Sequence, residues 1–110
     1  MEKKEQDRIV RRYYQYLKLE KGCSANTIDA YMRDLDKFLN FIKEEGKDFM
    51  TAQLEDMHNF SALMTDIGIN PVSLSRILSG IRSFYHFLVL GDIIDANPTE
   101  LLEFPKKPQH

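Results

Sequence analysis

Residues 24–45, SANTIDAYMRDLDKFLNFIKEE, carry the periodic pattern that decides the expected fold. Apolar side chains recur there every three or four positions, at Ile28, Tyr31, Met32, Leu35, Phe38, Leu39 and Ile42. Because an α-helix turns by about 100° per residue, this spacing gathers them on one face. Ser24 is a good N-cap, and Gly46 follows as a helix stop. The pattern predicts a long amphipathic helix that begins after Ser24 and ends near Glu45.

The same periodicity predicts three more main helices. The first covers about residues 5–20, the third about residues 51–67 with Thr51 as its capping start, and the fourth about residues 70–91. The fourth opens with Asn-Pro, an N-cap followed by proline at the first helical position. The same pair recurs at the start of residues 97–102, where a short fifth helix is expected. No strand-like alternation occurs. The sequence therefore predicts an all-α fold, a compact bundle of four main helices plus a short fifth.

The composition indicates one globular domain. Of the 110 residues, 43% are hydrophobic and 29% are charged, with 4 Pro and 5 Gly, which is typical of a helix-rich core and not of a disordered chain. No apolar run approaches the ~18 residues needed to cross a membrane, and no apolar signal segment follows the charged N-terminus. We therefore expect a cytoplasmic protein without a membrane partner. Residues 1–104 form the expected domain, and residues 105–110, with two prolines, are expected to begin a linker.

No constellation of side chains indicates catalysis. Cys23 has no cysteine partner for a disulfide or a metal site, and the histidines His58, His86 and His110 lie too far apart for a local metal motif. The chain also lacks a carboxylate pair, a glycine-rich phosphate loop, a nucleophile elbow and zinc-ligand spacing. We therefore expect no catalytic residue, no metal, no cofactor and no small-molecule substrate. A small enzyme is the least supported interpretation.

The charges are distributed unevenly along the chain. The formal net charge is −2, yet residues 1–21 hold seven Lys or Arg against four acids, a net of +3. Residues 71–90 hold two Arg and no acid, whereas residues 51–70 hold three acids and no Lys or Arg. Binding to nucleic acid requires local positive charge and not a basic protein as a whole. The overall charge therefore does not exclude a nucleic-acid partner.

The polar face of the helix expected over residues 70–91 is unusual. It consists of Val72, Arg76, Ser79, Ser83 and His86, with Ser73, Ser75, Gly80 and Arg82 alongside. A solvent-facing helix usually carries Glu and Lys, whereas this face carries serines, a glycine and no acid. Small side chains allow close approach, hydroxyls donate to phosphate oxygens, and arginine can bind phosphate or guanine through two N–H groups. The face suits a helix that lies against DNA, but Ser79, Gly80 and Ser83 suit close helix–helix packing equally well.

The polar face of the helix expected over residues 24–45 is basic at its centre. It consists of Asn26, Ala30, Arg33 and Lys37, flanked by Asp29 and Asp34. This face is a second candidate for contact with DNA. The alternative is an ordinary solvated face, in which Arg33 and Lys37 pair with neighbouring aspartates three or four positions away.

Two long blocks of sequence resemble a known family. They are residues 20–38, EKGCSANTIDAYMRDLDKF, and residues 73–85, SLSRILSGIRSFY, accompanied by Thr51-Ala52-Gln53, Asn97-Pro98 and Pro105-Lys106. In this order they are similar to the SAM-like core-binding domain of phage integrases and Xer-type tyrosine recombinases. The first block carries the Asn-Thr, Tyr and Arg-Asp-Leu elements typical of that domain. The resemblance covers about residues 7–108.

The resemblance implies a domain that forms half of a clamp around double-stranded DNA, with its second and fourth helices crossing the major groove. By position, it assigns DNA contacts to Asn26, Thr27, Ala30, Arg33, Ser73, Arg76, Ser79, Gly80 and Arg82, and to Lys106 and Lys107 on the linker. The polar faces described above add Lys37 and Ser75. The first and fifth helices are expected to contact neighbouring recombinase protomers in a tetrameric synapse.

The resemblance also places the chemistry elsewhere. Family members exchange DNA strands through a covalent phosphotyrosyl intermediate, formed by a separate catalytic domain, so none of the five tyrosines here is expected to be the nucleophile. Asp29 and Asp34 depart from a basic surface, and we expect the isolated domain to bind DNA weakly. The alternative is a helical protein–protein adaptor of the SAM or death-domain type that binds no DNA.

Overall fold

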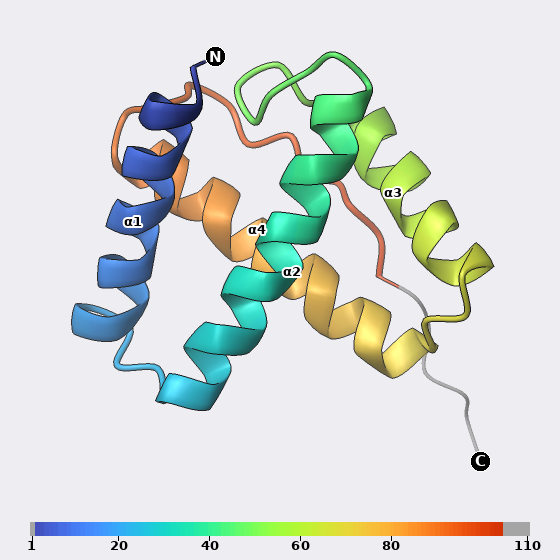
Figure 1. Ribbon diagram of the computed structural model, residues 1–110, viewed down its shortest axis with the longest axis horizontal. Coiled ribbons are helices and arrows are strands. Elements are labelled where there is room, and N and C mark those ends of the chain that lie inside the picture. Colours follow the sequence, from blue (N-terminus) through green and yellow to red (C-terminus); the bar gives the residue numbers. More distant parts are fainter. Residues whose placement is uncertain (1, 105–110) are drawn as a thin grey trace.

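The computed structural model describes residues 2–104, which form four helices and no strand (Figure 1). The helices are α1 (Lys3–Leu19), α2 (Ala25–Glu44), α3 (Leu54–Asp66) and α4 (Pro71–Leu90). The all-α prediction is confirmed, and the bounds of α1, α2 and α4 lie within two residues of those expected. None of these helices is both long and apolar enough to span a membrane. The expected linker, residues 105–110 with Lys106 and Lys107, lies outside the described residues.

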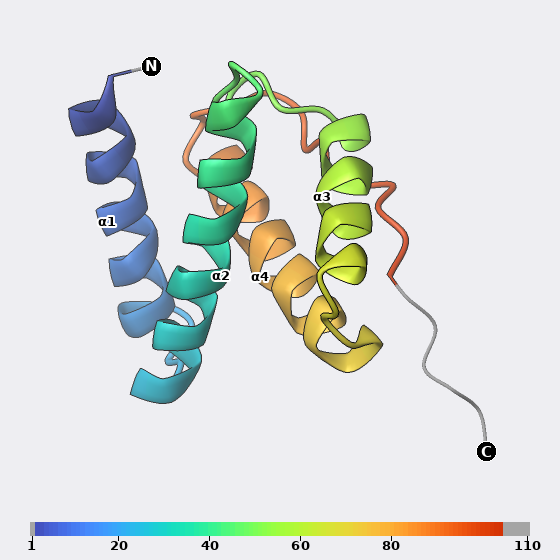
Figure 2. The same ribbon diagram turned by 45° about the vertical axis from the view of Figure 1, so that its right-hand side comes forward.

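The bundle is built around the crossing of α2 and α4. In Figure 1, α2 passes in front of α4, with α1 on one side and α3 on the other. Figure 2, turned by 45°, shows α1, α2 and α3 standing side by side while α4 runs obliquely behind them. Helix α4 contacts each of the other three helices. The segment after α4, residues 91–104, returns behind α2 from the α1 side of the bundle to the α3 side.

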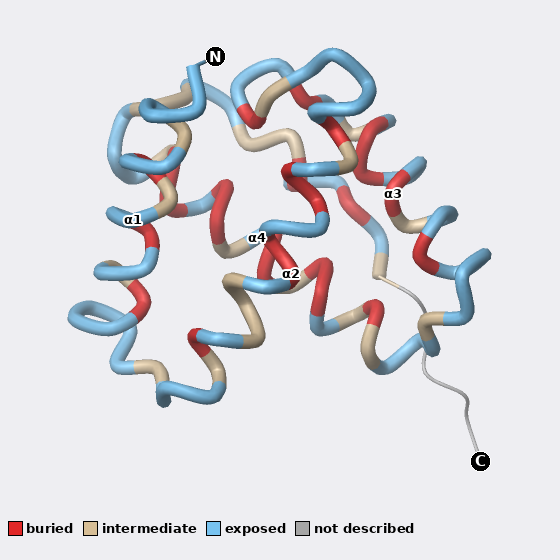
Figure 3. The backbone as a smooth tube through the Cα atoms, in the orientation of Figure 1, coloured by how far each residue is buried: buried red, intermediate tan, exposed pale blue. Residues whose placement is uncertain are grey.

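The core lies between these helices, and the buried positions face inward (Figure 3). The apolar stripe expected on α4 is buried at every position, namely Leu74, Ile77, Leu78, Ile81, Phe84, Tyr85 and Leu88. On α2, five of the seven predicted positions are buried, and Tyr31 and Met32 are half-buried. Six rings, of Tyr13, Phe38, Phe49, Phe60, Phe84 and Tyr85, are at most 1% exposed. Burial of a large aliphatic or aromatic side chain contributes about 1.5–3 kcal/mol, so these buried side chains of α1, α2, α3, α4 and the α2–α3 connection all stabilise the bundle.

Two predicted helix starts are confirmed. The Ser24 hydroxyl accepts a hydrogen bond from the Thr27 amide (3.2 Å), and the Asn70 side chain accepts one from the Ser73 amide (2.9 Å). These side chains satisfy amides that have no partner within the first turn of a helix. Gly46 ends α2 with a φ of 77°, a conformation that glycine adopts without steric cost.

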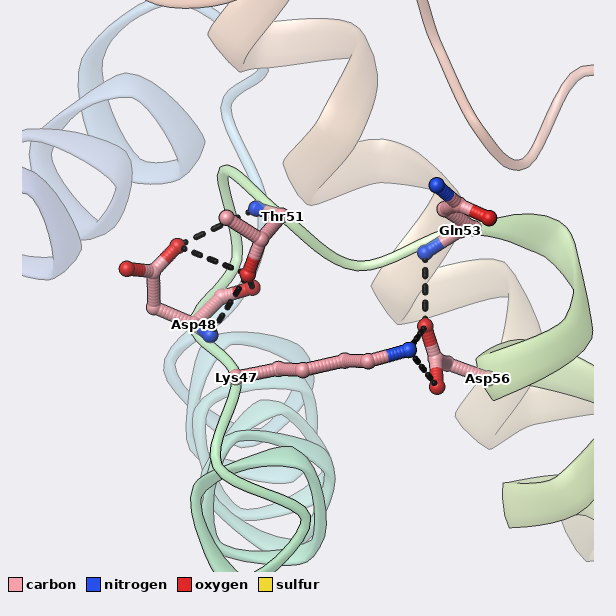
Figure 4. Close-up of polar contacts among 5 residues, drawn as sticks. All are labelled: Lys47, Asp48, Thr51, Gln53 and Asp56. Atoms are coloured by element: carbon pink, nitrogen blue, oxygen red, sulfur yellow. Dashed lines mark hydrogen bonds and ion pairs between the residues drawn. The ribbon is translucent and has the colours of Figure 1, made fainter.

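The start of α3 differs from the prediction. Thr51 does not cap the helix, because its hydroxyl accepts a hydrogen bond from the Asp48 amide (3.0 Å) in the preceding loop (Figure 4). The N-cap is Gln53, and α3 begins at Leu54. Asp56 accepts a hydrogen bond from the Gln53 amide (2.8 Å), and the Asp56 amide donates to the Gln53 backbone carbonyl (3.0 Å), so Asp56 fixes the first turn of α3.

The connection between α2 and α3 is fastened at two points. Lys47 Nζ donates to both carboxylate oxygens of Asp56 at 3.0 Å, as Figure 4 shows, and Asp56 is 4% exposed. The hydroxyl of Tyr85 on α4 donates to the Phe49 carbonyl (2.8 Å). Burial raises the pKa of Tyr85 well above its ordinary value, so this donor stays protonated. The connection is therefore held to α3 through Lys47 and to α4 through Phe49.

The prediction of a short fifth helix over residues 97–102 is wrong, because this segment forms consecutive turns. The Glu100 amide donates to the Asn97 carbonyl (3.2 Å), and the Leu102 amide donates to the Thr99 carbonyl (3.0 Å). The Asn97 side chain accepts from both the amide (2.8 Å) and the hydroxyl (2.6 Å) of Thr99, which favours a turn. Six residues also make too few hydrogen bonds to offset the cost of starting a helix. Buried Thr99 and Leu102 hold the segment against the bundle.

Candidate nucleic-acid interface

Gly80 lies where α4 meets α2. A Cβ atom at this position would approach the Tyr31 ring on α2 to 3.4 Å. The Gly80 carbonyl accepts a hydrogen bond from the buried hydroxyl of Tyr13 on α1 (3.3 Å), so three helices meet at this point. Gly80 is itself buried. The structure therefore favours the packing alternative for Gly80 and places it beneath the polar surface that we expected it to form.

Beside this crossing, an arginine of α4 binds an aspartate of α2. Arg76 Nε lies 3.1 Å from Asp34 Oδ2, and Arg76 Nη2 lies 3.3 Å from Asp34 Oδ1. The Asp34 side chain is only 2% exposed, whereas that of Arg76 is 50% exposed. Two parallel N–H contacts from one guanidinium are a strong way to hold a carboxylate. Arg76, a predicted DNA contact, is thus tied to α2 through Asp34, while half of its side chain stays exposed.

Lys37 completes this cluster. Its Nζ lies 4.0 Å from Asp34 Oδ1, and half of its side chain is exposed. The pairing alternative for Lys37 is therefore borne out at Asp34. Two cations share one carboxylate, so the cluster keeps a net charge of +1. Asp34, expected to weaken a basic surface from its flank, is instead buried and neutralised by its neighbours.

The other predicted contact residues of α2 and α4 are exposed or half-buried. Asn26, Arg33 and Arg82 are exposed, and Thr27, Ala30, Ser73, Ser75 and Ser79 are half-buried. Arg33 Nε donates to the Asp29 backbone carbonyl (3.4 Å), one turn earlier on α2. The Thr27 hydroxyl accepts from Ser24 (3.0 Å) at the helix start. Among the predicted residues, Arg76 and Gly80 join α4 to α2, through their contacts with Asp34 and Tyr31.

A polar groove of about 520 Å³ lies between α4 and the segment that follows it. Its lining residues are Lys21, Ser79, Arg82, Ser83, His86, Asn97, Glu100 and Phe104. The Arg82 guanidinium lies 5.5 Å from the centre of the Phe104 ring, within range of a cation–π interaction. Hydroxyl and cationic side chains together are suited to phosphate oxygens. The groove continues the polar face of α4 toward its C-terminal half.

Comparison with known proteins identifies the family. Residues 10–91 match the phage integrase N-terminal SAM-like domain family. The chain belongs to this family. Among its relatives is tyrosine recombinase XerC of Pediococcus pentosaceus, 34% identical over 101 residues, or 90% of this chain and 34% of the relative. Tyrosine recombinase XerC of Leptospira interrogans is 38% identical over 97 residues, or 87% of this chain and 31% of the relative.

A third relative, tyrosine recombinase XerD of Staphylococcus aureus, is 36% identical over 101 residues, covering 89% of this chain and 34% of that protein. This integrase-family chain spans about a third of the length of these curated relatives. No solved structure matches the chain significantly.

Three features of this integrase-family surface were not predicted from the sequence. Lys21 follows the first helix, and its only signal in the sequence is its position in the basic segment 1–21. The link between Asp34 and Arg76 joins residues 42 positions apart. Helical periodicity describes one helix at a time and cannot predict that these two side chains meet. The groove wall formed by Asn97 depends on the path of the segment after α4, which the sequence did not predict.

The tyrosines of this domain that lie deepest are structural. Tyr13 and Tyr85 are 0% exposed, and each donates its hydroxyl to a backbone carbonyl. Burial raises the pKa of each well above its ordinary range. Within residues 2–104, no three or more His, Cys, Asp or Glu side chains gather as a metal site would require.

Proposed function

We propose that this domain binds double-stranded DNA through the surface formed by α2 and α4. The observation that carries the proposal is the charge pattern of the crossing. Helix α4 carries Arg76 and Arg82 and no acid. The carboxylate of α2 that contacts Arg76, Asp34, is buried and held by two cations, Arg76 and Lys37. A phosphate backbone approaching this surface meets half-exposed cations and hydroxyls, with this carboxylate withdrawn beneath them.

The names of the relatives support a role in recombination. Each of the three proteins above is named a tyrosine recombinase. We propose that the domain serves a site-specific recombinase, supplying DNA grip and site preference, while the strand-cutting chemistry resides outside these 110 residues. In this proposal Asn26, Arg33, Lys37, Ser79 and Arg82 contact the duplex beside Arg76, and Gly80 supports them from beneath.

We also propose that α1 and the end of α4 contact a neighbouring protomer in the assembled recombinase. A groove of about 350 Å³ separates these helices, and its lining includes Leu19, Phe87 and Leu90. Leu19 is 75% exposed and Leu90 is 60% exposed, although both are large and apolar. Exposed apolar side chains grouped at a groove are typical of a protein contact.

DNA binding can be tested by titrating a fluorescent duplex with the 110-residue chain at two salt concentrations. Neutralisation of about four phosphates predicts a roughly 100-fold loss of affinity between about 50 and 200 mM salt. A charge-reversed variant, Arg33→Glu with Arg82→Glu, is expected to abolish binding. Its matched control, Lys18→Glu with Lys43→Glu, changes the net charge equally at exposed sites outside the proposed surface. Equal loss in both variants would contradict the assignment of the surface.

The alternative function is a protein–protein adaptor. An apolar groove of about 390 Å³ between α2 and α3 favours it, since Leu63 and Ile67 line the groove and are 40% and 63% exposed. An adaptor predicts no salt-dependent affinity for duplex DNA. It also predicts that Ile67→Glu removes binding to a protein partner while Arg82→Glu does not. The salt titration therefore separates the two functions.

A further inference from the structure

Asp34 is an unexpected residue in a surface that faces a polyanion. It lies in the middle of α2, its side chain is 2% exposed, and its carboxylate contacts Arg76 and Lys37. A buried carboxylate carries a desolvation cost that is offset only by well-placed partners. If its purpose were only to join α2 to α4, an apolar contact would do so without that cost. The placement of the charge therefore requires an explanation.

The geometry of the pair constrains the arginine more than the aspartate. Asp34 is fixed by burial within α2, and its two oxygens hold Nε and Nη2 of Arg76 at 3.1 and 3.3 Å. Because the guanidinium is planar, contact at two of its nitrogens fixes the plane as well as the position. Half of the Arg76 side chain remains exposed, so donors not used by Asp34 stay available at the surface.

The charges of Asp34 and Arg76 also indicate that the pair serves to orient the arginine. The Asp34 and Arg76 charges cancel, so Arg76 adds little to the general attraction of the domain for phosphate. The pair instead fixes the orientation of the Arg76 guanidinium. The conformational freedom of this side chain is therefore already lost before DNA binds. An ordered arginine edge is the group that reads guanine in the major groove. Lys37 and Arg33 remain to supply positive charge from the same helix.

We infer that Asp34 is a positioning residue, which orients Arg76 so that the domain discriminates between base sequences. This inference rests on the proposed DNA-binding function and adds a division of labour to it. Asp34 lowers the general affinity for DNA through its charge and raises sequence discrimination through Arg76. The two effects have opposite signs, and neutralising Asp34 separates them.

The experiment compares Asp34→Asn, Arg76→Ala, the double variant and the control Asp36→Asn, all in the 110-residue chain. Asp36 lies on the same helix, is exposed, and contacts Asn40 (3.4 Å), so Asp36→Asn makes the same charge change without touching Arg76. Each protein selects from a pool of short random duplexes, which is sequenced before and after selection. Affinity for the starting pool and for the pool enriched by the wild-type chain is measured by anisotropy.

We expect Asp34→Asn to lose the base-pair preference that Arg76→Ala loses, with about a 10-fold fall in affinity for the enriched pool. Its affinity for the starting pool should stay equal or rise. Asp36→Asn should keep the preference and bind both pools slightly more tightly. In the Arg76→Ala background, Asp34→Asn should cause no further loss of preference, because the two residues act as one unit.

Three results overturn the inference. They are an unchanged preference in folded Asp34→Asn, an unchanged preference in Arg76→Ala, or additive losses in the double variant. If thermal melting shows that Asp34→Asn is unfolded, Arg76→Lys replaces it, since lysine keeps the charge but cannot make the planar two-point contact. Retention of the preference by Arg76→Lys then also overturns it. Failure of the wild-type chain to bind duplex in a salt-dependent manner instead overturns the proposed function.

Discussion

The α2–α4 crossing and the α2–α3 connection are built from the same parts. Each contains a buried aspartate with a cationic partner, Asp34 with Arg76 and Asp56 with Lys47. Each also contains a buried tyrosine that donates to a backbone carbonyl, Tyr13 at Gly80 and Tyr85 at Phe49. The cations are similarly exposed, 50% for Arg76 and 40% for Lys47. Exposure therefore does not distinguish the two regions.

Two other properties distinguish them. Asp56 also accepts from the Gln53 amide, so its carboxylate belongs to a helix start, whereas the described contacts of Asp34 are with side chains. Residues 44–56 hold five acids and one Lys, whereas residues 71–90 hold two Arg and no acid. A polyanion is repelled from the first region and attracted to the second. The same buried pair serves stability in one place and presents a cation in the other.

The largest expected effect is on stability, at Asp56. Asp56→Ala removes the capping acceptor and the partner of Lys47 together, and we expect a loss of about 3 kcal/mol in the free energy of unfolding. Urea denaturation measures it. DNA affinity at a temperature where the variant is folded should be unchanged. A stability loss below about 0.5 kcal/mol would contradict the structural role of the α2–α3 connection.

Alkaline pH should weaken both regions through their tyrosines. Burial raises the pKa of Tyr13 and Tyr85 in the folded chain, while the unfolded chain ionises near pH 10, so stability is complete below about pH 10 and falls above it. Each tyrosine contributes about 1.4 kcal/mol of loss per pH unit, or about 3 kcal/mol for the pair by about pH 11. Tyr13→Phe and Tyr85→Phe should each remove half of this slope in urea titrations at several pH values. A slope that neither variant changes would exclude these tyrosines as its source.

Arg76→Ala should affect binding more than stability. We expect a loss of about 1–3 kcal/mol in binding to a preferred duplex, because a contact to a base disappears. Unfolding free energy should fall by only about 1 kcal/mol, because Lys37 remains near Asp34. Lys47→Ala is the matched comparison, with a similar cost in stability and no change in DNA affinity. If Lys47→Ala weakens DNA binding as strongly, the distinction between the regions fails.

The smallest expected effect belongs to Lys37. Lys37→Ala should weaken binding to all duplexes uniformly and reduce the salt slope by about 1, as loss of one phosphate contact does. Lys43→Ala, an exposed lysine on another side of α2, is the control and should leave the slope unchanged. A sequence-dependent loss in Lys37→Ala would assign base reading to Lys37 and not to Arg76.

Much of the fold could be predicted because it depends on local pattern. The apolar stripes of α2 and α4, the caps at Ser24 and Asn70 and the stop at Gly46 are confirmed. Where local signals compete, prediction failed. Thr51 was the only predicted start of the third helix, but Thr51 is bound to Asp48 in the loop, and α3 begins after Gln53, whose amide donates to Asp56. The Asn-Pro pair before Thr99 predicted a helix where hydrogen bonds over two and three residues formed turns.

The sequence predicted which polar helix faces form the candidate site, but not how these faces are arranged against one another. Periodicity assigned Arg33, Lys37, Arg76 and Arg82 to polar faces, and each is exposed. It also assigned Gly80 to such a face, although α2 covers it through Tyr31. Periodicity describes each helix alone, and which part of a face is covered depends on where the next helix crosses it.

By itself, the sequence determined the helical class, the approximate bounds of four helices, the core stripes and the family, because these depend on residue spacing within one helix or on the order of motifs. The tertiary structure decided the roles of Gly80 and Asp34. A carboxylate on α2 and a guanidinium on α4, 42 positions apart, become one unit only when the helices cross at Gly80. Contacts between helices depend on where the helices cross. That position is set by the joint burial of the apolar stripes of α2 and α4, so neither stripe alone determines it.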